Sequence, residues 1–142
     1  MEECNMYDPN RDPMISSVFI TRNKERDPIL VYQVDNNGLY INVHVQCANL
    51  KFGKHTFTLS VKDKNGKEYL EDKNIEIEIA DDGTTQSANS AIAEAILYIE
   101  MTPEELYGLN HIIISTKVDA SEAPELNSTN ILYLLKGDAD NG

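Results

Sequence analysis

A strict alternation of apolar and polar side chains runs through one stretch of this 142-residue chain, Ile41-Asn42-Val43-His44-Val45-Gln46-Cys47. Successive side chains of a β-strand point to opposite faces, so this run places its apolar residues on one face and its polar residues on the other. Similar alternations extend over residues 56–61 and 75–79. Strands with one buried and one hydrated face are typical of antiparallel sheets, and they predict an all-β fold.

Two Asn-Gly pairs, Asn37-Gly38 and Asn65-Gly66, separate apolar runs of this kind. Asn-Gly between alternating runs is a strong signal for a β-hairpin with a type I′ turn, because that turn requires positive φ at both central residues. We therefore expect one hairpin around each pair. The expected hairpin strands are residues 29–34 with 39–47, and residues 55–63 with 67–70.

The remaining short apolar runs bring the number of expected strands to seven or eight. That number of short strands, with frequent turn signals between them, predicts an antiparallel β-sandwich. The length fits a single domain, which we place at residues 14–136 between a flexible leader, 1–13, and a flexible tail, 137–142. The further strands are expected at residues 18–22, 75–79, 112–118 and 131–135.

Residues 87–101 fit two descriptions. Their apolar residues alternate acceptably as a strand, and they also form a helical stripe that the alanines favour; we prefer a strand over at least 95–101. The segment that follows is clearer, because Thr102 as N-cap, Pro103 at the first helical position and Glu105 at the third form a capping box. One short helical turn is therefore expected near residues 102–107, and its glutamates are helix-start residues.

The segment Gly53–Gly66, with the sequence GKHTFTLSVKDKNG, resembles a hairpin that is common in immunoglobulin-like sandwich modules. The short helical turn between two late strands is also similar to a link found in such modules. The resemblance implies an immunoglobulin-like β-sandwich and no particular function, since sandwiches serve many unrelated roles. The chain lacks the tryptophan of antibody-type domains, and its two cysteines, Cys4 and Cys47, form no disulfide framework. We expect Cys47 to be a buried free thiol.

The negative charge is concentrated in the second half of the chain. Residues 1–73 carry eleven acids and ten bases, a net charge of −1, whereas residues 74–142 carry thirteen acids and two bases, a net charge of −11. A field of one sign repels nucleic acid and anionic membranes and attracts basic partners. No apolar run is long enough to span a bilayer and no secretory signal is visible, so we expect a cytoplasmic protein without membrane insertion.

Two features are candidates for binding a partner. Glu76 and Glu78 share one strand face about 7 Å apart, close to the phosphate spacing along one DNA strand, and Asp81 and Asp82 follow them. These four acids indicate either a hydrated outer face beside aggregation-prone isoleucines or a surface that imitates nucleic acid. Tyr40 is the second feature, because it shares the polar face of its strand with short polar groups and histidine, as residues of recognition surfaces do.

No pattern for catalysis, a cofactor or a metal ion stands out. The three histidines lie in no zinc-binding spacing, and there is no nucleophile elbow and no phosphate-binding glycine loop. We therefore expect a non-enzymatic module that binds a protein partner, as a structural or adaptor component of a bacterial or viral assembly, with homo-oligomerisation left open. Two alternatives are an acidic inhibitor that mimics nucleic acid and an enzyme whose site is assembled only in space.

Overall fold

The computed structural model describes residues 14–48, 53–79, 92–119 and 126–136. Most of these residues are in strands, as the alternating sequence predicted. One helical turn interrupts them. In chain order the elements are β1 (Met14–Arg22), β2 (Val31–Val34), β3 (Leu39–Ala48), β4 (Gly53–Lys62), β5 (Glu68–Ile79), β6 (Ile92–Met101), α1 (Pro103–Leu106), β7 (His111–Asp119) and β8 (Leu126–Lys136).

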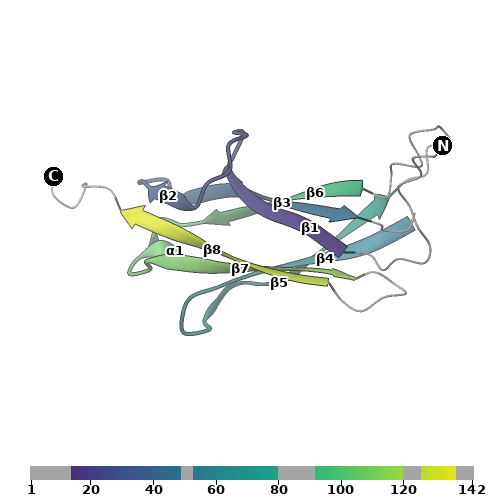
Figure 1. Ribbon diagram of the computed structural model, residues 1–142. Helices are drawn as coiled ribbons and strands as arrows, with labels where there is room; N and C mark the ends of the chain where they lie inside the picture. Colours follow the sequence, from purple (N-terminus) through teal and green to yellow (C-terminus); the bar gives the residue numbers. More distant parts are fainter. Residues whose placement is uncertain (1–13, 49–52, 80–91, 120–125, 137–142) are drawn as a thin grey trace.

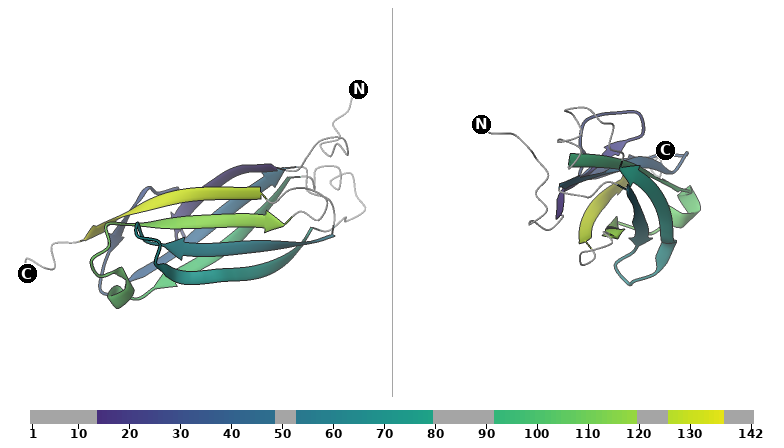
Figure 2. Two further views of the ribbon diagram at one scale, coloured as in Figure 1. Left: turned by 90° about the horizontal axis from the view of Figure 1, so that it is seen from below. Right: turned by 90° about the vertical axis from the view of Figure 1, so that its right-hand side faces the viewer.

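The strands form two sheets that stack face to face as a sandwich (Figures 1 and 2). The three-stranded sheet has the order β1-β3-β6, and the five-stranded sheet has the order β2-β8-β7-β4-β5. The predicted all-β sandwich is confirmed. The sheets approach each other along β1 and β8, where the Asn130 side chain donates a hydrogen bond to the backbone oxygen of Val18 at 3.2 Å.

The expected hairpin around Asn37-Gly38 is wrong, and one strand pair of the otherwise antiparallel sandwich is parallel. Strand β2 pairs in parallel with β8, whereas β3 lies in the other sheet. The turn between them is closed by Asp35, which accepts from Gly38 N through its backbone oxygen at 3.1 Å and from Asn37 N through Oδ1 at 2.8 Å. Since φ is positive at Gly38 and not at Asn37, the turn is not type I′ and does not require strand pairing on both sides.

Gly38 is required by the packing as well as by its backbone angle. Its φ is +86°, and a Cβ at this position would lie 2.2 Å from the backbone oxygen of Met101 at the end of β6. The turn that carries the chain between the two sheets therefore depends on a residue without a side chain.

The hairpin around Asn65-Gly66 is confirmed, and it joins β4 to β5 with Lys62 opposite Glu68. Its turn differs from the expected type I′, because positive φ occurs at Gly66 and not at Asn65. The predicted runs 67–70 and 75–79 fall on one strand, β5. It carries an extra residue at each of two register shifts, opposite the steps from Leu59 to Val61 and from Val61 to Lys62 of β4.

The ambiguous segment is a strand over Ile92–Met101, so the helical alternative is wrong there; residues 87–91 lie outside the described part of the chain. The short helix is confirmed. Thr102 Oγ1 accepts from Glu105 N at 3.2 Å, and Glu105 Oε1 accepts from Thr102 N at 2.9 Å, which completes the predicted capping box. In the part of the chain that the structure describes, no helix combines the length and the apolar composition needed to cross a membrane.

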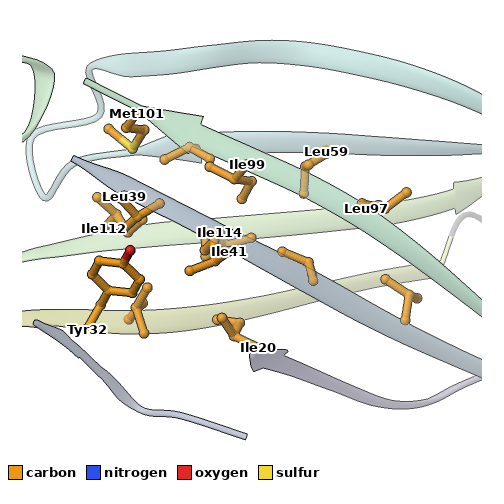
Figure 3. Close-up of a cluster of buried hydrophobic side chains, with 14 of the residues drawn as sticks. Ile20, Tyr32, Leu39, Ile41, Leu59, Leu97, Ile99, Met101, Ile112 and Ile114 are labelled. Atoms are coloured by element: carbon orange, nitrogen blue, oxygen red, sulfur yellow. The ribbon is translucent and has the colours of Figure 1, made fainter. Parts of the chain in front are cut away.

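The core lies between the sheets and is formed by the inward-facing residues of both (Figure 3). On β3, Ile41, Val43 and Val45 are completely buried. Cys47 is also buried and forms no disulfide, as predicted, and burial raises the pKa of its thiol to about 11. At one end of the core Tyr32 lies beside Leu39, with its hydroxyl toward β3 (Figure 3). The largest fully buried side chains are Phe57, Leu39, Ile41, Leu59, Leu97, Ile99, Leu106, Ile112, Ile114 and Leu132.

Candidate functional site

The predicted acidic surface on β5 contains a positively charged residue from the neighbouring strand β4, Lys54. Glu76 and Glu78 are exposed on the edge strand β5 and alternate with the half-buried Ile75 and Ile77, as expected. Lys54 of β4 lies opposite Glu78 in the register, and its Nζ is 3.9 Å from Glu76 Oε1. The pair is well exposed and contributes little stability. It places a positive charge among the carboxylates, which weakens any imitation of a phosphate row. Asp81 and Asp82 lie outside the described residues.

Tyr40 lies on the outer face of the other sheet, so the structure does not bring it together with Glu76 and Glu78. Its side chain is 44% exposed. In the register of β3 with β6, Tyr40 is opposite Glu100, and the next outward pair is Asn42 with Tyr98. We call these four residues the Tyr40 face.

Asn42 is the least expected member of the Tyr40 face. Although it alternates with the core residues Ile41 and Val43 and therefore faces outward, only 8% of its surface is exposed. Its Oδ1 accepts no hydrogen bond from the described residues. A buried polar atom without a partner costs about 1–3 kcal/mol, so such an atom calls for an explanation.

His44, the next outward residue of β3, is held on several sides. Its ring stacks on Phe19 with centroids 4.5 Å apart and planes 4° apart. Its Nε2 lies 3.0 Å from Thr21 Oγ1, and its Nδ1 lies 2.7 Å from Glu94 Oε2. Both ring nitrogens are thus engaged within the sheet, and the arrangement braces the three strands. Among the residues that the structure describes, no group of three or more histidine, cysteine or acidic side chains is placed to hold a metal ion.

A hollow of about 360 Å³ adjoins the Tyr40 face at the end of the sandwich. It lies between the segment after β1, the turn after β2 and the end of β6. Tyr32 forms part of its wall, and the guanidinium of Arg22 lies 4.7 Å from the centroid of the Tyr32 ring. The Tyr32 hydroxyl accepts a hydrogen bond from Tyr40 N at 3.2 Å. We call this feature the end hollow; the residues that matter below are Arg22, Glu25, Tyr32, Asp35, Tyr40 and Glu100.

A second surface was missed by the sequence analysis. Large apolar side chains are exposed on β8, on β2 and on the residue before β2. Figure 1 shows β2 beside the arrowhead of β8 at one end of the five-stranded sheet. The residues opposite these positions in β2 and β7 carry no carboxylate. We call this surface the β8 apolar patch; its members and their exposed fractions are Leu30 (78%), Val31 (46%), Ile131 (44%), Tyr133 (54%) and Leu135 (54%).

The signal for this patch was present in the sequence. Residues 131–135 are apolar at five consecutive positions, whereas a half-buried strand needs apolar residues only at alternate positions. Leu132 and Leu134 face the core, and the three residues that alternate with them are exposed. The excess of apolar residues on the outer face therefore has no role in the core of this chain.

No known family matches the sequence, and no curated protein matches it. Among solved structures, a putative β-galactosidase from Bacteroides fragilis is similar over 85% of this chain, with 11% identity and a TM-score of 0.57. This chain spans only 17% of that protein. A β-glucuronidase from Bacteroides uniformis (12% identity, TM-score 0.48, 85% of this chain and 14% of that one) is also similar. The sporulation control protein Spo0M from Bacillus subtilis is similar too, with 8% identity and a TM-score of 0.40 over 86% of this chain and 49% of that one. The first similarity supports the β-sandwich fold alone.

Proposed function

We propose that this chain is a non-enzymatic module that binds another protein as a structural or adaptor component of an assembly, and that the β8 apolar patch is its contact surface. The observation that carries this proposal is the set of five large apolar side chains, each at least 44% exposed, on the paired strands β2 and β8 and the residue before β2. Exposed contiguous apolar surface of this kind marks interaction sites in proteins. Tyr133 adds the amphipathic contact area that is enriched in interfaces.

The occupant we favour is a different protein with an apolar surface of its own. A second copy of this chain would bring a formal charge of −12 against an equal charge, and net charge of one sign opposes association. We also assign the sandwich to the immunoglobulin-like type, because β1 and β2 join different sheets, β2 runs parallel to the last strand, and a helical turn links β6 to β7. The single-domain limits 14–136 and a cytoplasmic location stay predictions.

The test is a pull-down with the tagged full-length chain from source-cell lysate, washed at low and at high salt. Salt screens exposed charges over about 10 Å at 0.1 M and about 3 Å at 1 M, but it does not weaken apolar contacts. We expect a partner that survives the high-salt wash and is lost with Tyr133→Ser and Leu135→Ser. The matched control is Ile96→Ser, since Ile96 is also exposed (43%) but lies on the other sheet and outside the Tyr40 face.

Three outcomes would overturn the proposal. A partner that elutes at high salt and is lost with Glu76→Lys and Glu78→Lys would favour the acidic inhibitor instead. A wild-type dimer in light scattering that Leu135→Ser dissociates would identify a second copy as the occupant. Equal loss of binding with Ile96→Ser and Tyr133→Ser would show that the patch has no special role.

A further inference from the structure

We propose that the end hollow and the Tyr40 face together form a binding site for a cationic side chain, the guanidinium of an arginine on a partner protein segment. This site is separate from the β8 apolar patch in position and in chemistry. It therefore stands or falls independently of the contact surface proposed above.

The first argument is the balance of charge in the end hollow. Glu25, Asp35 and Glu100 line it together with Arg22, which gives a formal charge of −3 + 1 = −2. Within the described residues none of these carboxylates forms an ion pair, and Arg22 instead lies over the Tyr32 ring. The carboxylates of this concave surface outnumber its one cation, and the net negative charge favours a cationic ligand.

The second argument is the orphan acceptor on the adjoining face. Asn42 is more than nine-tenths buried on the outer side of β3, two residues from Tyr40, and its Oδ1 has no donor among the described residues. What this position lacks is a hydrogen-bond donor. Tyr98 lies opposite Asn42 on β6, and Tyr40 lies two residues before it on β3; they are 54% and 44% exposed. In the proposed complex, a ligand that stacks on these rings displaces them far enough for its donor to reach the buried oxygen.

The third argument is the match between these groups and a guanidinium. A guanidinium carries five N–H donors and no acceptor, so the carboxylates and the amide oxygen of this site offer it suitable partners. Its planar cation also stacks on tyrosine rings, and Tyr40 and Tyr98 offer two of them. The volume of about 360 Å³ lies within the usual range of ligand sites, roughly 300–1,000 Å³.

The same groups disfavour other ligands. An anion would be repelled by the carboxylates and by the formal charge of −12 on the whole chain. A neutral sugar would stack on the tyrosines and donate hydroxyl protons, but it would leave the negative charge of the hollow without a counter-charge. An experiment can therefore distinguish a cationic ligand from an anionic ligand and from a neutral sugar.

The test is an NMR titration of the full-length ¹⁵N-labelled chain with the peptide acetyl-Gly-Arg-Gly-amide. The same peptide with citrulline in place of arginine is the matched probe, because citrulline keeps the shape and loses the charge. We expect the arginine peptide to shift the amide signals of Tyr40, Asn42 and Glu100, and the citrulline peptide to bind about tenfold more weakly. Cellobiose serves as the neutral sugar.

Variants separate the site from the general acidity of the chain. Glu100→Gln and Asp35→Asn each remove one negative charge from the hollow, and each should weaken binding of the arginine peptide about fivefold to tenfold. Glu78→Gln removes the same charge from the exposed edge of β5 and should leave binding unchanged. All three positions lie outside the hydrophobic core, and dispersed amide signals would verify that each variant is folded.

Several results would overturn the proposal. These are shifts spread over the whole acidic surface, equal weakening by Glu78→Gln and Glu100→Gln, equal binding of the citrulline peptide, and no shifts at the highest soluble peptide concentration. Shifts of the same amides by cellobiose but not by the arginine peptide would assign the face to a neutral polyhydroxylated ligand instead.

Discussion

The hydroxyl of Tyr69 donates a hydrogen bond to Asp63 Oδ2 at 3.1 Å, across the turn that joins β4 to β5. The other carboxylate oxygen of Asp63 accepts from Asn65 N at 2.8 Å and from Lys67 N at 3.0 Å. Asp63 is only 8% exposed, yet its charge is fully hydrogen-bonded. The turn is therefore organised around one ionised carboxylate.

This arrangement makes the hairpin sensitive to acid. Desolvation raises the pKa of Asp63, but the hydrogen bonds from Lys67, Asn65 and Tyr69 and the charge of Lys67 outweigh it, so the pKa lies below its ordinary value of 3.8. A lowered pKa in the folded state stabilises the fold above the ordinary value, and this contribution is lost as the pH falls below it. We expect thermal unfolding monitored by circular dichroism to show a fall in Tm below about pH 4.

Tyr69→Phe is the variant that tests the contact. It removes the donor to Asp63 and should bring the pKa of Asp63, followed by carboxyl ¹³C shifts, closer to 3.8. In the wild type, desolvation and the contact with Asp63 raise the pKa of Tyr69. The stability that this gives is lost as the pH rises above 10. An unchanged Asp63 titration in Tyr69→Phe would contradict the role assigned to the hydroxyl.

Gly38→Ala should destabilise the fold far more than Gly66→Ala. Both glycines have φ near +87°, but a Cβ meets the Met101 oxygen at Gly38 and nothing within 4 Å at Gly66. Left-handed backbone costs a non-glycine residue about 1–2 kcal/mol, which is the loss expected for Gly66→Ala. The added clash should raise the loss for Gly38→Ala to about 3 kcal/mol or more. Urea denaturation of the two variants measures the difference, and equal losses would show that the close approach is absent in solution.

Asn42→Leu should stabilise the chain. It replaces a buried oxygen that has no donor with an apolar group of similar size, so we expect the free energy of unfolding to rise by about 1 kcal/mol. Asn42→Asp buries an unpaired charge at the same place and should lower it by about 3 kcal/mol at neutral pH. A loss of stability in Asn42→Leu would mean that the amide already has a partner in the folded protein.

The thiol of Cys47 should be inert until the protein unfolds. A rise in its pKa from 9.0 to about 11 lowers the thiolate fraction at pH 8 about a hundredfold, and the thiolate is the reactive form. In a Cys4→Ser variant, which leaves Cys47 as the only thiol, we expect no reaction with a disulfide reagent in buffer and one reacting thiol in denaturant. Rapid labelling of the native protein would indicate that this end of β3 opens readily.

The fold was predictable where the relevant physics is local. The alternation around Ile41 and Val43 fixed both the strand and its buried face, and the capping box at Thr102 located the helical turn. The hairpin expected at Gly38 is absent because the same kind of turn, an Asx-type turn that ends in glycine, has two uses in this fold. At Gly66 it joins two paired strands, whereas at Gly38 it joins strands of different sheets. The two have the same local geometry, and pairing with β8, about 100 residues away along the chain, decides between them.

The candidate sites were less predictable for the same reason. The position of Tyr40 on an outward face followed from alternation, but the burial of Asn42 depends on neighbours from β1 and β6 that no local pattern shows. The outer face of β8 was hidden because a run of apolar residues does not say which of them the core uses. The end hollow joins three segments distant in sequence, so its carboxylates could not be grouped in advance.

The parallel pairing of β2 with β8 has a mechanical consequence. Four register pairs, from Val31 with Tyr133 to Val34 with Lys136, hold the two strands side by side. A pull applied at Val31 and Lys136 draws these strands in opposite directions along their length. The hydrogen bonds between the two strands are then loaded in shear, all at the same time. Strands that are peeled apart from one end instead lose their hydrogen bonds one at a time. Tension that reaches these two strands is therefore resisted by all of their shared hydrogen bonds at once.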